Sequence, residues 1–239
     1  MSQYRLAQHA FVCVTKDYPV ILDLENDRYI AVAPQDSVDL QGFIEGWPAA
    51  GGQSTAPAIG RTATEPPVIQ HLLEQGLISP DPTGKPATPP QIEAPEAALI
   101  DGYEEVHARL RVRDIARVAA AAGQTIASLR ALGLSKVIRG IRKNRMSASH
   151  RYKATLVADD RALVAMYSQI RPFIFTSRKA CMIDSIVMSQ FLSGFGSLPH
   201  CVFGVRSSPF AAHCWVQRDG LVYNDTAENV RKFTPILVI

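Results

Sequence analysis

The chain has 239 residues, of which 47% are hydrophobic, and its formal net charge is +3 at pH 7. This length holds one or two domains, and this share of hydrophobic residues can build a core. The small net charge gives no sign of nucleic-acid binding, and no apolar run approaches the roughly 18 residues of a membrane span. We therefore expect neither a nucleic-acid partner nor a membrane-spanning segment.

The four cysteines form no Cys-x-x-Cys pair and show no metal-ligand spacing with histidine, so we expect no metal site. The N-terminus lacks the apolar core of a signal peptide, which indicates a reduced, cytoplasmic protein. In that compartment Cys13, Cys201 and Cys214 are expected to be buried thiols. Strand alternation should point Cys214 to the opposite face from its neighbour His213.

The N-terminal part combines short strands with helices. Residues 9–15 read as a strand, and 20–32 read as two strands around an Asn26-Asp27 turn. A helix is predicted to begin near Pro34 or Asp36, and a second helix to run from Pro66 and close at Gly76. Between these helices, residues 47–65 form a long predicted loop that is rich in small and polar residues. These elements predict a small α+β unit.

Two runs of this unit, at 20–32 and 68–78, resemble the PqqD-like RiPP recognition element, a winged-helix module that binds leader peptides of ribosomal-peptide maturation. In such modules an extended leader adds to the sheet edge beside the last helix. The resemblance implies that seven residues form a leader-binding surface. The alternative for each of them is that it packs in the hydrophobic core. The seven residues are Arg28, Tyr29, Ile30, Val32, Val68, Leu72 and Leu73.

A proline-rich segment separates the two parts of the chain. Six of the sixteen prolines lie between Ser79 and Glu96, which predicts a semi-extended linker. We therefore expect a recognition domain over 1–80, a linker over 81–99 and a second domain over 100–239.

The second part opens with helices and a basic stretch. Residues 103–122 and 125–134 carry helix formers at helical spacing, and 157–171 predict a further helix. Between Arg130 and Lys153 there are eight lysines and arginines and no acidic residue. This stretch is either a solvated helix face or a docking surface for an acidic partner, a nucleotide phosphate or acidic leader residues. The chain has no Walker A loop that would support a dedicated ATP site.

A cysteine-bearing helix is predicted next. Thr176 or Ser177 could cap it, which places Cys181 in or near its first turn. There the unpaired backbone N–H groups and the helix dipole favour the thiolate, and they could help to bind an oxyanion. Ser185, one turn later, could contact the site or simply pack the helix. The apolar positions recur at spacings of three and four and predict one buried face: Ile183, Ile186, Val187, Phe191 and Phe195.

A hairpin follows the helix and carries two further candidate residues. Asp219-Gly220 between two apolar runs is a strong hairpin signal. His213 lies six residues before this turn and Asp225 lies five after it, so adjacent antiparallel strands can bring their side chains together. Asp225 could then hold the imidazole in the tautomer that accepts the Cys181 proton.

Together these residues resemble the transglutaminase-like leader peptidases of lasso-peptide biosynthesis, the B proteins. The resemblance covers about residues 155–239 and rests on Cys181-Met-Ile-Asp-Ser185, Gly204-Val-Arg, Phe210-Ala-Ala-His213-Cys-Trp215-Val and Asn224-Asp225. His213 follows Cys181 by 32 residues and Asp225 follows His213 by 12, as that family requires. Met182 stands where the family usually has leucine. The resemblance implies a transglutaminase-like, papain-like cysteine peptidase domain, with Cys181 as nucleophile, His213 as base and Asp225 as orienting acid.

The two resemblances together imply a cysteine peptidase that binds the leader of a lasso precursor peptide and cuts at the leader–core junction. The implied partners are that precursor and an asparagine-synthetase-like lasso cyclase. No cofactor is expected, and ATP dependence would enter only through the cyclase. Two alternatives stay open: a transglutaminase-like acyltransferase that uses an amine in place of water, and a non-catalytic scaffold that delivers precursor to a cyclase.

Overall fold

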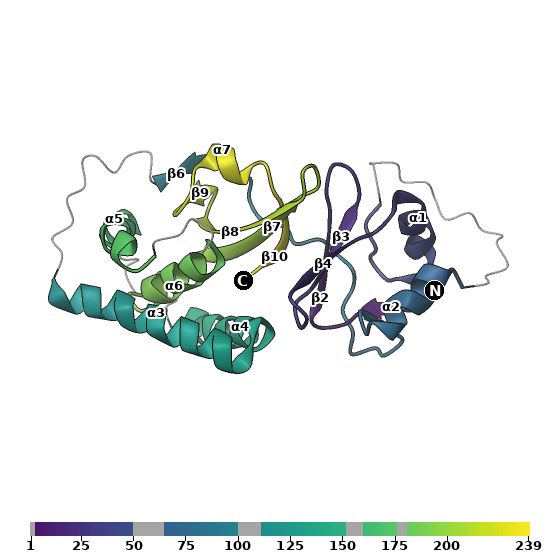
Figure 1. Ribbon diagram of the computed structural model, residues 1–239, viewed down its shortest axis with the longest axis horizontal. Coiled ribbons are helices and arrows are strands. Elements are labelled where there is room, and N and C mark those ends of the chain that lie inside the picture. Colours follow the sequence, from purple (N-terminus) through teal and green to yellow (C-terminus); the bar gives the residue numbers. More distant parts are fainter. Residues whose placement is uncertain (1–2, 50–64, 100–110, 152–159, 176–180) are drawn as a thin grey trace. The chain divides into compact units, whose positions relative to one another are not determined.

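The computed structural model describes residues 3–49, 65–99, 111–151, 160–175 and 181–239. Their contacts divide the chain into two compact units, whose elements are labelled in Figure 1. The first unit contains Met1–Gln91, Val205–Ala211 and Thr234–Leu237, and the second contains Ile92–Gly204, Ala212–Phe233 and Val238–Ile239. The division between Gln91 and Ile92 falls inside the proline-rich segment.

A three-stranded antiparallel sheet forms the centre of the first unit. Strands β2 (Ala10–Val14), β3 (Pro19–Asp23) and β4 (Arg28–Ala31) lie in the order β2-β3-β4, so β4 is an edge strand. Every residue of the central strand β3 is buried. Asp27, between β3 and β4, has a φ of 49°, a left-handed conformation that aspartate tolerates. The two strands predicted around Asn26-Asp27 are therefore confirmed.

Two helices and a second short sheet complete this unit. Helices α1 (Pro34–Phe43) and α2 (Pro67–Glu74) each begin with a proline, whose fixed φ suits a first helical turn. Gly76 follows α2 with a φ of 67°, and the chain turns back so that β5 (Ile78–Ser79) pairs with β1 (Arg5–Leu6). The two helices were predicted. The β1–β5 pair was not, because two-residue strands carry no periodic signal.

The core of the first unit reaches into the long loop predicted over 47–65. Trp47 is buried in this core, and its indole Nε1 donates a hydrogen bond to Ser37 Oγ over 3.0 Å. The loop is therefore anchored where it starts, whereas residues 50–64 lie outside the described residues. The core includes Leu6, Val12, Ile21, Leu40, Ile69, Leu72 and Leu77.

The proline-rich segment is bonded to folded structure at both ends. The Lys85 N–H donates to the Leu6 carbonyl over 2.9 Å, and Ala87 has no exposed surface. Further along, the Glu93 carbonyl accepts a hydrogen bond from Gln217 Nε2, and strand β6 (Ala97–Ala98) pairs with the larger sheet. Residues 81–99 thus differ from a free linker, because their backbone groups find partners in folded elements.

A five-stranded sheet carries the hairpin predicted from the sequence. Its order is β10-β7-β8-β9-β6, with β7 at His200–Arg206, β8 at Ala211–Arg218, β9 at Leu221–Val222 and β10 at Thr234–Val238. Between β8 and β9, Asp219 and Gly220 have φ values of 50° and 73°, the pattern of a tight hairpin turn. The hairpin prediction is confirmed.

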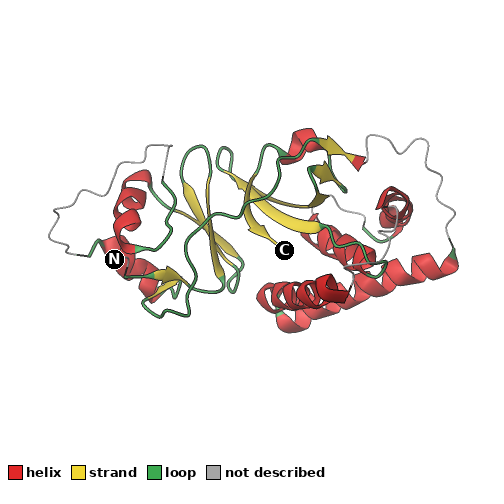
Figure 2. Cartoon of the chain, turned by 180° about the vertical axis from the view of Figure 1, so that it is seen from behind, coloured by secondary structure: helices red, strands yellow, loops and turns green. Residues whose placement is uncertain are grey.

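Helices of the second unit lie beside this sheet, as Figure 2 shows. They are α3 (Val112–Leu132), α4 (Leu134–Arg151), α5 (Asp160–Ile170), a 3₁₀ turn η3 (Arg171–Phe173), α6 (Cys181–Ser193) and the short α7 (Ala227–Val230). Helix α3 packs along α6 and against α4. Among the described residues, no helix combines the length and the apolar character needed to cross a membrane.

Helix α3 joins two segments that the sequence suggested as separate. It runs without interruption through Gly123 and Gln124 and ends at Gly133, whose φ is 78°. A glycine inside a helix costs about 1 kcal/mol relative to alanine, a cost that packing along α6 can offset. The part of this prediction before Arg111 lies outside the described residues.

Helix α6 corrects the prediction of a single buried face. Five consecutive residues, from Asp184 to Met188, are all buried. Helices α3 and α5 pack against α6, and a hydrogen bond from Ser185 reaches β8. Because neighbours lie on several sides of the helix, the polar residues Asp184 and Ser185 are buried together with apolar ones.

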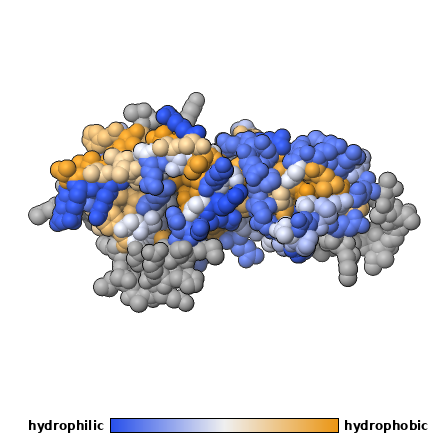
Figure 3. Space-filling view, turned by 90° about the horizontal axis from the view of Figure 1, so that it is seen from below, coloured by the Kyte–Doolittle hydropathy of each residue, from blue (hydrophilic) through white to orange (hydrophobic). Residues whose placement is uncertain are grey.

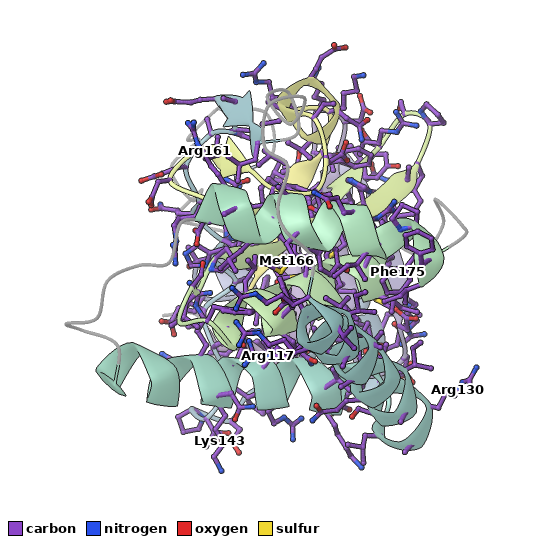
Figure 4. All side chains as sticks on the ribbon, turned by 90° about the vertical axis from the view of Figure 1, so that its left-hand side faces the viewer. Arg117, Arg130, Lys143, Arg161, Met166 and Phe175 are labelled. Carbon is purple, nitrogen blue, oxygen red and sulfur yellow. The ribbon has the colours of Figure 1, made fainter. Side chains whose placement is uncertain are left out.

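The basic stretch occupies the end of α3 and most of α4. Arg130 and Lys143 project outward in Figure 4, and Lys136, Arg139 and Arg142 are also exposed. Arg145 is half-buried and donates to the Pro199 carbonyl over 2.5 Å. The side chains of Arg151 and Lys153 lie outside the described residues. In Figure 3 the molecule is seen from below, and both hydrophilic residues (blue) and hydrophobic residues (orange) lie on its surface.

Candidate active site

Cys181 is the first residue of α6 as described, and its side chain is half-buried. Its sulfur is hydrogen-bonded to the His213 side chain and to the backbone of Cys214 and Met182. Backbone N–H groups near a sulfur stabilise its anionic form. The predicted capping residues, Thr176 and Ser177, lie outside the described residues.

His213 lies on β8 between aromatic side chains. Its Nε2 is 2.5 Å from Asp225 Oδ2, and its ring is also hydrogen-bonded to the Cys181 side chain. The Trp215 ring stacks at a centroid distance of 6.0 Å, and the Phe233 ring lies at 5.1 Å. Gly204 on β7 makes room for this packing, since a Cβ there would meet the Trp215 ring at 2.7 Å. The imidazole is therefore held by packing as well as by hydrogen bonds.

Asp225 is fixed by groups at the start of α7. Its Oδ1 accepts from the Thr226 N–H over 2.7 Å, and its Oδ2 accepts from Asn229 Nδ2 over 2.8 Å. Thr226 is itself the N-cap of α7. These two hydrogen bonds fix the orientation of the carboxylate, so that Oδ2 faces His213. The sequence prediction that 213 and 225 come together across the hairpin thus matches the observed geometry.

The three side chains form one hydrogen-bonded chain that sets their charges. The hydrogen bond to His213 lowers the pKa of Cys181 against the opposing effect of burial. Burial alone would lower the pKa of His213, but its bonds to Asp225 and Cys181 raise that pKa to about 9. Burial also opposes ionisation of Asp225, yet the bonds from His213 and Asn229 lower its pKa. These shifts favour a thiolate–imidazolium pair, the reactive form of a nucleophilic cysteine.

This arrangement lies within a recognised family domain. The family model described as the transglutaminase-like superfamily matches residues 106–238, more than half of the chain. The chain belongs to the transglutaminase-like superfamily. Members are typically cysteine-dependent enzymes, and they include cysteine peptidases and acyltransferases. No curated protein and no solved structure matches the chain.

Two polar residues of the transglutaminase-like domain connect the elements that carry the candidate residues. Ser185 Oγ donates to the Cys214 carbonyl over 3.0 Å and accepts from Asn224 Nδ2 over 2.9 Å. Asn224 Oδ1 accepts from the Val216 N–H over 2.8 Å. The sequence left two roles open for Ser185: contact with the site, or packing of its own helix. The hydroxyl is bonded to Asn224 and to the strand that bears His213, so it contacts residues next to the site.

A buried carboxylate in α6 was missed by the sequence analysis. Asp184 accepts from the Tyr167 hydroxyl and from Arg171 Nε, each over 2.8 Å. These bonds tie the first turn of α6 to α5 and η3. An aspartate three residues after the candidate cysteine, the one charged residue of α6, is the signal that could have revealed it, since a buried carboxylate needs partners.

The other three cysteines are buried, as predicted. Cys214 and Cys201 approach each other at 3.5 Å between sulfurs, on the side of β8 away from His213, as strand alternation requires. Burial raises the pKa of Cys214 well above its ordinary value. Cys214 therefore differs from Cys181, whose pKa is lowered.

The predicted leader-binding residues divide between core and surface. Val32 and Leu72 are only 4% and 2% exposed and belong to the core of the first unit, because they pack among its other apolar residues. They are therefore corrected to core positions. Ile30, Val68 and Leu73 are partly buried against that core. Arg28 is exposed and hydrogen-bonds Asp23 and Gln75, and Tyr29 is half-buried on edge strand β4.

Proposed function

We propose that this protein is a cysteine peptidase that binds the leader of a lasso-peptide precursor and hydrolyses the leader–core bond. The observation that carries the proposal is the hydrogen-bonded chain from Cys181 through His213 to Asp225, inside a transglutaminase-like domain. In this proposal Cys181 is the nucleophile, His213 the general base and acid, and Asp225 the residue that orients the imidazole.

The chemistry follows from the charges of these groups. The Cys181 thiolate attacks the scissile carbonyl and forms a tetrahedral adduct, which collapses to a thioester as the C–N bond breaks. Protonated His213 gives its proton to the leaving amine. Neutral His213 then takes a proton from water, whose oxygen attacks the thioester. Cleavage of the C–S bond releases the carboxylate of the leader and regenerates the thiolate and the imidazolium.

We assign residues 1–80 as a PqqD-like recognition module with a winged-helix fold, joined through residues 81–99 to the peptidase domain at 100–239. Support comes from the position of β4 at the edge of the described three-stranded sheet, since an extended leader could pair with an edge strand through main-chain hydrogen bonds. Attachment to one chain raises the concentration of substrate at a site that binds weakly by itself. The accessible residues of the assigned surface are Arg28, Tyr29, Ile30, Val68 and Leu73.

The freed core amine is the group that a macrolactam-forming enzyme needs. We therefore propose an asparagine-synthetase-like lasso cyclase as the partner that consumes the product. The peptidase step needs no cofactor, since nucleophile, base and acid all come from side chains. ATP would enter only through the cyclase, and we propose that the protein acts in the cytoplasm.

The test is mass spectrometry of the precursor peptide encoded beside this gene, incubated with the protein in the presence and absence of the cyclase. We expect a leader fragment and a core fragment whose masses sum to the precursor plus one water. Cys181→Ala should abolish both fragments. Cys13→Ala, at a buried cysteine of the first unit, is the matched control and should leave cleavage unchanged.

Three other outcomes would change the assignment. Cleavage by Cys181→Ala would exclude this residue as nucleophile. Precursor that binds but is never cut, even with the cyclase, would favour a scaffold. A leader-containing product that carries an added amine would favour an acyltransferase, the other activity that the superfamily includes.

A further inference from the structure

A buried serine joins the helix that bears Cys181 to the strand that bears His213. Ser185 has no exposed surface and lies four residues after Cys181, so the two side chains share one face of α6. Its hydroxyl donates to the Cys214 carbonyl and accepts from Asn224. This single group therefore bridges α6 and two positions of the hairpin that lie 29 and 39 residues further along the chain.

The Asn224 side chain links Ser185 to β8, because it is hydrogen-bonded both to the Ser185 hydroxyl and to the Val216 backbone. Strand β9 ends at Val222, and the Tyr223 N–H still donates to the Val216 carbonyl over 2.8 Å. The return bond of this pair, from the Val216 N–H, goes to the Asn224 side-chain Oδ1 in place of the Tyr223 carbonyl. The backbone is thereby free to leave the sheet at the point where Asp225 must turn toward His213.

Each end of this bridge is close in sequence to one member of the candidate triad. Ser185 is one helical turn from Cys181, Cys214 follows His213, and Asn224 precedes Asp225. Cys214 has a second link to the site, because its backbone also hydrogen-bonds the Cys181 sulfur. A shift of the Cys214 backbone would therefore disturb the nucleophile directly.

We infer that Ser185 and Asn224 act as a positioning pair that fixes Cys181, His213 and Asp225 relative to one another. The inference rests on the proposed function only in taking these three residues as the reacting groups. A small helix rotation or a change in the path after β9 would lengthen the hydrogen bond between Cys181 and His213. Since that bond is what favours the thiolate, loss of the pair should slow every reaction of the Cys181 sulfur.

The experiment measures alkylation of Cys181 by iodoacetamide between pH 5 and 9, read at the level of the Cys181 peptide by mass spectrometry. Ser185→Ala removes both bonds of the hydroxyl. Ser189→Ala is the matched control, because Ser189 lies one turn further along the same helix and donates only to the Ser185 carbonyl, over 2.8 Å. Circular dichroism checks that each variant is folded.

We expect Ser185→Ala to be alkylated about tenfold more slowly than wild type at pH 7, because a longer hydrogen bond to His213 raises the pKa of Cys181 and leaves less thiolate. The midpoint of the alkylation profile should move to higher pH, and Ser189→Ala should follow the wild-type profile. Asn224→Ala should slow alkylation in the wild-type background. If Asn224 and Ser185 act as a pair, the same substitution should cause a smaller further slowing in the Ser185→Ala background.

A wild-type alkylation profile in folded Ser185→Ala would overturn the inference and leave Ser185 as a packing residue. If that variant does not fold, Asn224→Ala removes the other half of the pair, and the same slowing is expected at Cys181. Alkylation needs no peptide substrate. A wild-type protein that never cleaves the precursor would therefore reject the proposed function, while the alkylation profiles would still decide the role of Ser185.

Discussion

Cys13 and Cys181 are the same residue type in two regions of the molecule. Cys13 lies in β2 of the first unit without exposed surface, and burial raises the pKa of its thiol to about 12. Cys181 lies at α6, where burial acts in the same direction but the hydrogen bond to His213 outweighs it and lowers the pKa. The difference between an inert thiol and a candidate nucleophile therefore lies in the hydrogen-bond partner.

Two carboxylates repeat this comparison. Asp23 in the first unit is fully buried, and its pKa is lowered despite burial because Asn26 and Arg28 donate to it. The pKa of Asp225 in the second unit is likewise lowered despite burial, because His213 and Asn229 are hydrogen-bonded to it. The guanidinium beside Asp23 keeps its charge at all ordinary pH values, whereas the imidazole beside Asp225 can lose a proton. The His9 imidazole lies 3.9 Å from Asp23, so of these two carboxylates only Asp225, at 2.5 Å from His213, has an imidazole within hydrogen-bonding distance.

The largest expected effect comes from removing His213, the hydrogen-bond partner that Cys181 has and Cys13 lacks. His213→Gln should reduce peptide turnover by about 10³-fold, because it removes the general base and the group that favours the thiolate. Alkylation of Cys181 at pH 7 should fall toward the low rate of an ordinary thiol. His200→Gln, on the same sheet, is the control and should keep the wild-type alkylation rate. Undiminished Cys181 reactivity in His213→Gln would contradict the comparison.

A smaller effect is expected when the imidazole stays and its orienting carboxylate loses its charge. Wild-type turnover should rise with pH as Cys181 ionises and fall as pH passes about 9, where His213 loses its proton. In Asp225→Asn the bond that raises the pKa of His213 is weakened while burial still lowers it. The fall should therefore move to lower pH, with turnover reduced about 10²-fold at neutral pH, because His213 is still present as the base.

The pH–rate profile of Asp219→Asn is the control for this change. Asp219 carries the same charge in the turn of the same hairpin, and asparagine tolerates its positive φ. Its profile should match that of wild type. An Asp225→Asn profile that keeps the descending limb near pH 9 would show that Asp225 does not set the charge of His213.

The smallest expected effect tests the packing that holds the imidazole. Gly204→Ala places a methyl group 2.7 Å from the Trp215 ring, which lies over His213, so ring or strand must move. We expect a loss of about 1–3 kcal/mol in the free energy of unfolding, measured by urea denaturation. Gly140→Ala is the control, since a Cβ there meets nothing within 4 Å and should leave stability unchanged or increase it. Equal stability of both variants would contradict the tight packing at Trp215.

Local patterns in the sequence were sufficient for the elements that carry the candidate site. Asp219-Gly220 between apolar runs predicts the hairpin because a tight turn needs residues that accept positive φ. The counts on either side of that turn then bring His213 and Asp225 together. Proline likewise marks the start of α1 and of α2, and glycine marks the end of α2, because their effects act within one or two residues.

Only the tertiary structure decided which polar groups meet around α6. Asn224 reaches Ser185 across 39 residues, and Arg171 reaches Asp184 from a different element. It also decided that Val32 and Leu72 are core, which periodicity could not distinguish from a binding surface, since both need apolar residues at the same spacing. Hydrogen bonding and burial of a side chain depend on what other segments place beside it, and that information is not local to the residue.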